Sequence, residues 1–151
     1  MIRYLLITLL FLIGLAATTN AQSTLALKEK IADKYYKNMS YLQAIATYED
    51  ILRENPTNTR VLPNLAYSYR KISDMQNAER VFARVVNLDT TNAAHVLEYA
   101  QVLAINKKYK ESATQYERYN LLKPNDSRSQ SFKSLYQSDT LLINKNLKVN
   151  I

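Results

Sequence analysis

The residues that could do chemistry in this sequence are few, and they exclude more chemistry than they support. His95 is the single histidine and there is no cysteine, so thiolate nucleophiles, disulfides and metal sites built on cysteine or paired histidines are excluded. Acidic pairs such as Glu49 and Asp50 are adjacent, so their carboxylates diverge on a helix and cannot act as an acid and base pair. No hydroxyl residue stands in a pattern that supplies a base and an orienting group. We therefore expect no catalytic residue, no metal, no cofactor and no small-molecule substrate.

Gly14 is the single glycine, and it lies in the apolar run that opens the chain. Loops that hold phosphate groups need glycine where the backbone approaches the anion, so dinucleotide and P-loop nucleotide binding are excluded. Tight hairpins between strands also favour glycine, which disfavours a sheet-rich fold. The composition therefore predicts an all-α protein without enzymatic equipment.

The charge does not indicate a nucleic-acid partner. Twenty Lys and Arg against 13 Asp and Glu give a formal charge of +7 over 151 residues, and the excess is spread along the chain. Proteins that bind nucleic acid concentrate basic residues on one face or stripe. A solvated surface is the simpler interpretation.

Residues 1–21 have the pattern of a secretory signal peptide. Arg3 precedes an apolar run from Leu5 to Ala17, and small residues ending at Ala21 offer a cleavage site before Gln22. A membrane-spanning helix needs about 20 apolar residues, more than this run provides, so cleavage is favoured over an uncleaved anchor. We expect an exported, periplasmic protein that reaches the outer membrane only through a partner or a further domain.

An internal repeat organises the rest of the chain. The interval from Pro56 to Thr90 equals that from Thr90 to Pro124, and good N-cap residues recur with the same period at Thr24, Asn58, Asn92 and Asp126. A helix with one apolar face precedes each closing residue, built from the sets Tyr41, Ala44, Tyr48, Ile51; Met75, Ala78, Phe82, Val85; and Tyr109, Ser112, Tyr116, Tyr119. An earlier helix in each repeat carries Ile31, Ala32, Tyr35; Leu65, Ala66, Tyr69; or Tyr99, Ala100, Leu103. The small residue in each trio lets two helices approach closely.

This period and these residue types resemble the tetratricopeptide repeat (TPR). Three copies fit, at 25–58, 59–92 and 93–126, with Lys28, Leu62 and Val96 departing from the usual tryptophan. The resemblance implies an all-α superhelix of three helix-turn-helix repeats, in which each helical pair hides its apolar face against its neighbours. Residues 127–138, after Asp126, are predicted to form a capping helix.

The C-terminal residues 139–151 alternate between apolar and polar from Leu147 to Ile151, which is typical of a strand. No partner strand exists in this chain, so the tail is disordered, pairs with another chain, or continues into a longer protein. The signal peptide, the repeats and the stretches 122–128 and 144–150 together resemble the N-terminal module of certain Gram-negative envelope proteins. In that group the repeats precede a β-propeller and an outer-membrane protein A-like domain, and some members serve type IX secretion.

On the repeat template, the first-helix face lines a concave groove, where aromatic and basic residues are the usual anchors of a partner. We predict that partner-binding groove residues are Tyr36, Lys37, Arg60, Tyr67, Arg70, Lys71, Leu97 and Gln101. Some TPR domains grip a C-terminal carboxylate with Lys, Asn and Arg, but the corresponding places here hold Glu29, Asp33, Asn64, Ala94 and Glu98, so we expect no such clamp.

The sequence therefore predicts a non-enzymatic adaptor of the bacterial cell envelope that binds a partner protein or extended peptide in its groove. An alternative is an assembly component of a peptidoglycan-anchored outer-membrane or secretion complex, docked through the C-terminal strand.

Overall fold

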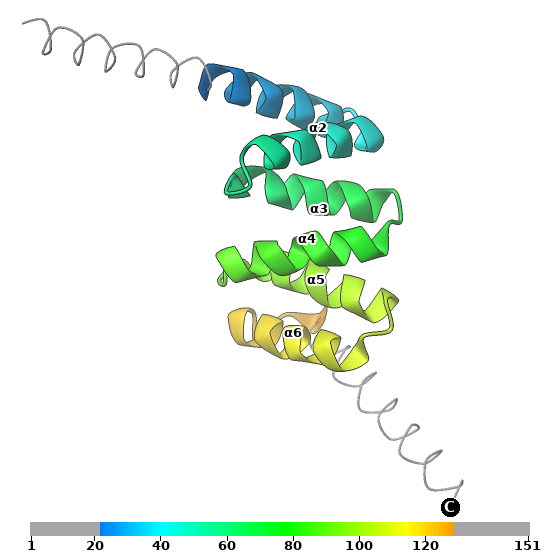
Figure 1. Cartoon of the computed structure of the whole chain (residues 1–151). Helices are drawn as coiled ribbons and strands as arrows, with labels where there is room; N and C mark the ends of the chain where they lie inside the picture. The colour runs from blue at the N-terminus through cyan, green and yellow to red at the C-terminus, as the bar shows by residue number, and fades with distance from the viewer. Residues whose placement is uncertain (1–21, 129–151) are drawn as a thin grey trace, which may run out of the picture. The chain divides into compact units, whose positions relative to one another are not determined.

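The computed structural model describes residues 22–128, and the predicted signal peptide, most of the predicted capping helix and the tail lie outside these residues. Ser127 and Arg128, at the start of that capping helix, are helical. The described residues contain helices and no strand, which confirms the all-α prediction (Figure 1). No described helix is both long and apolar enough to span a lipid bilayer. The chain divides after Val61 into two compact units, and each is treated by itself below.

The described residues of the first unit, 22–61, contain one helical pair. Residues 22–37 are helical and are followed by α2 (Tyr41–Glu54) and the short 3-10 helix η1 (Thr59–Val61). Ala32, Ala44, Tyr48 and Ile51 are fully buried, and the Tyr48 hydroxyl donates to Asp33 Oδ1 at 2.6 Å.

Polar contacts also hold this pair together. Lys28 forms ion pairs with Asp50 and Glu54 of α2. Farther along the chain, Asn58 Nδ2 donates to Glu29 Oε1 at 2.6 Å, which brings the segment after α2 back to the first helix.

Between Leu62 and Leu122 the second unit has four helices, in which each packs against the next. They are α3 (Leu62–Lys71), α4 (Met75–Leu88), α5 (Ala93–Ile105) and α6 (Tyr109–Leu122) (Figure 1). The second helices of the three repeats, α2, α4 and α6, begin at Tyr41, Met75 and Tyr109, in the predicted phase. A core cluster joins α4, α5 and α6, with α5 apolar on two sides because it lies between the other two; its members are Val86, Ala93, Val96, Leu97, Ala100, Tyr116 and Tyr119.

Several predicted core and cap positions differ from expectation. Ile31, Tyr35 and Tyr109 are 41%, 37% and 48% exposed, although they share phase with buried residues.

The predicted N-cap residues have different outcomes. Asn92 does cap α5, since its side chain accepts from the His95 amide at 3.4 Å, and Asp126 accepts from the Arg128 amide at 2.9 Å. Thr24 lies inside the helix of residues 22–37, so its predicted capping role is wrong.

The turn inside each helical pair contains a residue with positive φ, and none of the three is glycine. Met39, Ser73 and Lys107 have φ of 60°, 62° and 62° and occupy the same position in consecutive repeats. This conformation costs an L-residue about 1–2 kcal/mol, and helices usually end on glycine there. Because the chain has so little glycine, these turn positions are occupied by residues for which positive φ is strained.

Replacing Lys107 by glycine is expected to raise the free energy of unfolding by about 0.5–1 kcal/mol, because glycine adopts positive φ without the Cβ clash. Urea unfolding followed by circular dichroism measures the change. Lys110→Gly is the matched control: it removes the same side chain from the first turn of α6, where no positive φ is relieved, and should lower the free energy of unfolding by no more than about 1 kcal/mol. Equal effects of the two substitutions would contradict the assignment of strain to Lys107.

Candidate functional site

Two first helices of the second unit, α3 and α5, carry a connected set of polar and aromatic side chains that we call the α3–α5 face: Tyr67, Arg70, His95, Glu98 and Gln101. Arg70 forms an ion pair with Glu98, and its Nη2 donates to Gln101 Oε1 at 2.8 Å. The side chains of Arg70 and Glu98 keep 31% and 22% of their exposure. Glu98 and Gln101, three positions apart on α5, thus both contact Arg70 of α3. These two contacts fix the Arg70 guanidinium in one position at the surface.

An aromatic contact supports the same face. The Tyr67 ring stands edge-on to Phe82 of α4, with centroids 5.3 Å apart and planes at 88°, and lies 6.2 Å from the His95 ring. Phe82 is fully buried, so Tyr67 rests on the core while remaining partly exposed. His95 Nδ1 is buried without a hydrogen-bond partner among the described residues. No group of three His, Cys, Asp or Glu residues among them is arranged to hold a metal ion.

The structure brings together three of the predicted groove residues, Tyr67, Arg70 and Gln101. Lys71, at the end of α3, is exposed. Leu97 is 5% exposed and belongs to the core cluster, so its prediction as a groove residue is wrong. The reason is that α5 is covered on two sides, by α4 and α6, which leaves Leu97 no surface for a partner.

The other three predicted groove residues lie in the first unit. Tyr36 is half-buried and its ring packs edge-on to Tyr41, with centroids 5.9 Å apart. Lys37 is exposed, and Arg60 is exposed with its Nε 3.2 Å from Glu29 Oε2. The role of all these residues in binding a partner stays a prediction.

Glu98 and His95 belong to the α3–α5 face but were not among the predicted site residues. In the sequence, Glu98 indicates only a mismatch to the carboxylate clamp. The available signal was charge: Arg70 and Glu98 are opposite in sign on the first helices of consecutive repeats, whose equivalent faces adjoin.

A second polar cluster joins α4 to the connection between α5 and α6. Glu79 accepts from Asn106 Nδ2 at 2.8 Å and from Lys108 Nζ at 2.6 Å, and Asn106 Nδ2 also donates to the Met75 carbonyl at 2.9 Å. Partial burial raises the pKa of Glu79, but the hydrogen bonds from Lys108 and Asn106 outweigh it and leave that pKa below its ordinary value. A shallow depression of about 450 Å³ lies here, bounded by Gln76, Glu79, Ile105, Asn106, Lys107 and Lys108. Because Glu79 is used in holding the helices, we assign the cluster a structural role.

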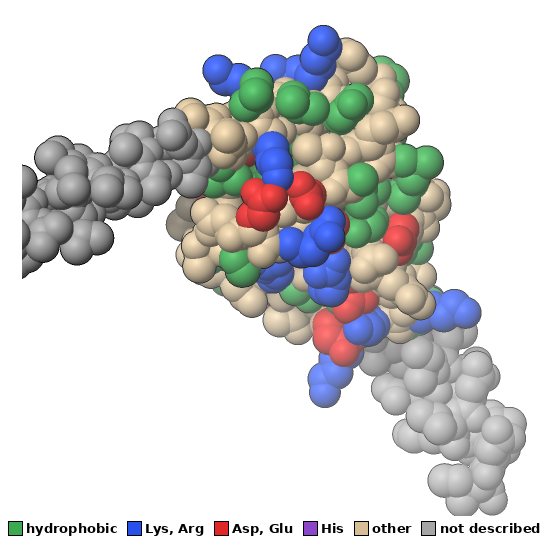
Figure 2. Space-filling view, turned by 45° about the horizontal axis from the view of Figure 1, so that its top comes forward, with side chains coloured by type: hydrophobic (Ala, Val, Ile, Leu, Met, Phe, Trp, Pro, Cys, Tyr) green, Lys and Arg blue, Asp and Glu red, His purple; other side chains and the backbone are tan. Residues whose placement is uncertain are grey.

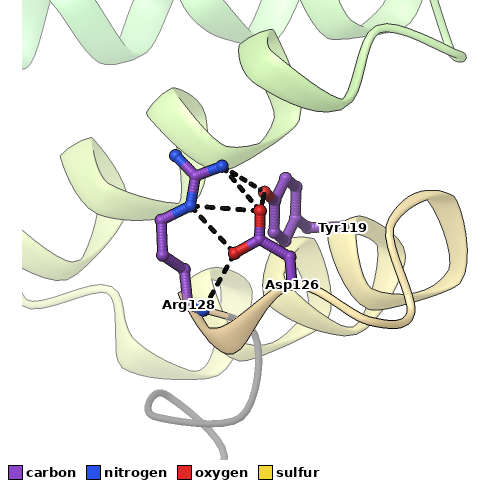
Figure 3. A network of polar contacts seen from close by, with 3 residues as sticks. All are labelled: Tyr119, Asp126 and Arg128. Carbon is purple, nitrogen blue, oxygen red and sulfur yellow. Dashed lines mark hydrogen bonds and ion pairs between the residues drawn. The ribbon is translucent and has the colours of Figure 1, made fainter.

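A third cluster fixes the chain where it leaves α6. The Tyr119 hydroxyl donates to Asp126 Oδ2 at 2.7 Å, and Arg128 Nε donates to Asp126 Oδ1 at 2.9 Å (Figure 3). The guanidinium of Arg128 also lies 5.8 Å from the centre of the Tyr119 ring. The hydrogen bonds from Arg128, and then that from Tyr119, hold the pKa of Asp126 well below its usual range.

Asp126 should therefore stabilise the fold in a pH-dependent way. Its pKa is lower in the folded than in the unfolded state, so its contribution is complete above the ordinary value of 3.8 and is lost as the pH falls through the folded-state pKa. The difference in melting temperature between the unmodified protein and Asp126→Asn is expected to be largest near neutral pH and to shrink below about pH 4. Glu117→Gln, on the exposed side of α6, is the control. A difference for Asp126→Asn that stays constant on acidification would contradict this role.

The charged surface is mixed in sign. On the face drawn in Figure 2, acidic side chains lie next to basic ones in several places, and ion pairs are formed in both units. Such a surface agrees with the absence of a concentrated basic stripe in the sequence.

The comparisons with known proteins are informative about the fold. No protein-family model matches the sequence, and no curated protein matches it significantly. The structure is similar to the Arabidopsis OM64 TPR domain (TM-score 0.62, 17% identity, 76% of this chain and 95% of that chain). It is also similar to the second TPR domain of human RPAP3 in complex with an HSP70 peptide (TM-score 0.63, 22% identity, 76% of this chain and 96% of that chain). A third similar structure is the MamA protein of AMB-1 (TM-score 0.72, 15% identity, 77% of this chain and 63% of that chain). The described residues have the fold of tetratricopeptide-repeat domains, as the sequence predicts.

Proposed function

We propose that this protein is a non-enzymatic interaction scaffold that binds an extended segment of a partner protein at the α3–α5 face. The observation that carries the proposal is the fixed Arg70, held at the surface by Glu98 and Gln101 beside a partly exposed Tyr67. Side chains already held in place lose little conformational entropy when a partner binds. Tyrosine and arginine are also the residues that most often dominate binding energy at protein interfaces.

Two neighbours of the same fold support a peptide partner. The second TPR domain of human RPAP3 was solved with the HSP70 peptide SGPTIEEVD, and the first TPR of Spaghetti with the HSP90 peptide SRMEEVD. Both peptides are acidic at their C-terminal ends. In this chain Arg70 is already neutralised by Glu98, so it offers no free positive charge to such an end, and the proposed segment is therefore not acidic.

We place this scaffold in the bacterial cell envelope. The support is the secretory pattern of residues 1–21 and the resemblance of the chain to the N-terminal module of Gram-negative envelope proteins. Mass spectrometry of the protein isolated from a cell-envelope fraction tests this placement: a mature N-terminus at Gln22 agrees with it, and an intact N-terminus in the cytoplasmic fraction contradicts it.

The binding proposal is tested with peptides selected on the full chain from a phage-displayed random library. Replacing Tyr67 and Arg70 together by alanine is expected to weaken the selected peptides by about tenfold or more, since both anchors are lost. Fluorescence anisotropy measures the affinity, and circular dichroism verifies that the helices remain.

Two control proteins define where the peptides bind. Lys110→Ala, on an exposed position of α6, should leave the affinity unchanged. Deletion of residues 139–151 should also leave it unchanged, whereas loss of binding on this deletion would favour docking through the tail. If the Tyr67 and Arg70 double variant binds the peptides as well as the unmodified protein, the α3–α5 face is not the site.

A further inference from the structure

The helix of residues 22–37 exposes an apolar stripe on the side away from its buried residues. Leu27, Ile31 and Tyr35 are spaced by four and therefore lie on one helical face, and they are 59%, 41% and 37% exposed. Met39, in the turn after this helix, is 74% exposed. We call these four residues the outer face of the first unit. Contiguous exposed apolar side chains of this size mark interaction surfaces.

The repeat register shows what kind of surface this is. One repeat later, the counterparts of Ile31 and Tyr35 are Leu65 and Tyr69, which are 0% and 9% exposed. Two repeats after Tyr35, Leu103 is 1% exposed on α5, the helix that packs against α4 of the preceding repeat. Within the second unit, this register position thus lies on the face by which α5 receives the preceding helical pair, and no described helix precedes the outer face.

In the second unit, specific polar groups accompany this stacking. Glu98 of α5 pairs with Arg70 of the preceding α3, and Asn106 binds Met75 and Glu79 of the preceding α4. The residues in the same register of the first repeat are Lys30 and Asn38, and both are exposed. At this stacking position the third repeat therefore carries a carboxylate, Glu98, whereas the first repeat carries an amine, Lys30.

A second lysine strengthens this charge difference. Lys34 is exposed, whereas its counterparts Ser68 and Val102 are fully buried. Among residues 22–128, no carboxylate lies within ion-pair distance of Lys30 or Lys34. Lys28, on the opposite flank of the stripe, is already neutralised by Asp50 and Glu54. Within the described residues, the flank with Lys30 and Lys34 therefore carries unpaired positive charge. The positive charge on the flank with Lys28 is neutralised.

A second copy of this chain would not complement that flank. If α5 and α6, its last described helical pair, stacked on the outer face in the repeat register, Ala104 would take the place of Arg70 and Ala113 that of Glu79. Neither alanine can accept from Lys30 or Asn38, and Lys34 would be covered without a counter-charge, which is costly.

We infer that the outer face of the first unit is a second binding surface, which stacks on an amphipathic helix of another protein that carries carboxylates opposite Lys30 and Lys34. The apolar stripe supplies the buried contact, and the unpaired lysines select an acidic flank on one side of the partner helix. This surface is separate from the α3–α5 face and does not depend on the function proposed for it.

The test uses the full chain and a stapled amphipathic helix with leucine at every fourth position and glutamates along one flank. A second peptide has lysines in place of the glutamates. Fluorescence anisotropy is expected to give an affinity about tenfold higher for the glutamate peptide. Ile31→Glu should abolish binding, because it puts a charge at the centre of the apolar stripe.

Charge-reversal variants distinguish charge-specific recognition of the peptide from nonspecific apolar binding. The Lys30→Glu, Lys34→Glu double variant should prefer the lysine peptide, whereas Lys110→Glu on α6 should keep the original preference. Thermal melts verify that these exposed substitutions leave the fold intact. Failure of both peptides to bind, equal binding of the two, or an unchanged preference in the double variant would overturn the inference.

Two further outcomes would reassign the surface and thereby overturn the inference. Self-association in analytical ultracentrifugation that Ile31→Glu abolishes would assign the outer face to a second copy. Binding to phosphatidylglycerol vesicles that depends on Lys30 and Lys34, without binding to either peptide, would assign it to a lipid surface.

Discussion

Replacing Phe82 by alanine is expected to lower the free energy of unfolding by about 3–5 kcal/mol, the range for removing a buried aromatic side chain. Phe82 is fully buried in α4, and its ring also supports Tyr67 through the edge-on contact at 5.3 Å. The substitution leaves a cavity under α3 and removes that aromatic contact. Since small domains are stable by about 5–15 kcal/mol, this one change would remove a large part of the total.

Guanidinium unfolding followed by circular dichroism measures this loss. Phe82→Leu is the graded control, because it keeps most of the apolar volume and should cost less than the alanine variant. Leu88→Ala, which truncates a residue of the same helix that is 58% exposed, should be close to neutral. A loss of less than about 1 kcal/mol for Phe82→Ala would mean that the ring does not organise this core.

The regularity of the helical pairs could be predicted because the same residue types recur with one period. The fully buried Ala44, Ala78, Tyr48 and Phe82 all lie at positions that the repeat marks as core. Repeat phase predicts burial only where a neighbouring helix is present to cover the residue. Leu103, in the same phase as Tyr35, is buried on α5, which packs against α4 of the preceding pair, whereas Tyr35 is exposed on a helix that no described helical pair precedes.

The candidate site was predicted less completely, for reasons that concern geometry rather than residue type. Arg70 and Gln101 could be assigned to the first-helix face, but their direct contact depends on how closely α3 and α5 approach. Leu97 was misplaced because a face assigned from one helix pair ignores the second covering helix of α5.

The connections between helices were also beyond the sequence pattern. A methionine, a serine and a lysine gave no indication that positions 39, 73 and 107 adopt positive φ. The Ser40 to Gln43 pattern indicates a capping box, but Ser40 makes no capping hydrogen bond, whereas Asp74 caps α4 by accepting from the Asn77 amide at 3.1 Å. The chain follows the repeat in its helices and departs from it in its turns.

Ala100→Leu is expected to destabilise the protein by about 2–3 kcal/mol through overpacking. Ala100 is fully buried in the core cluster, and its carbonyl accepts from the fully buried Ser112 hydroxyl of α6 at 2.7 Å. A larger side chain at this point would push against the surrounding cluster and separate α5 from α6. The sequence predicts this sensitivity from the small residue shared by all three repeats.

Thermal and urea unfolding of Ala100→Leu, compared with Ala94→Leu, test this prediction. Ala94 lies on the same helix but is exposed, so the same enlargement there should change stability by no more than about 0.5 kcal/mol. Because α5 also carries Glu98 and Gln101, a displaced α5 should weaken the hold on Arg70 as well. Peptide binding at the α3–α5 face would then fall in Ala100→Leu even under conditions where it remains folded. A variant with unchanged stability would show that α5 and α6 can separate at this point without cost, and the small residue would then need another explanation.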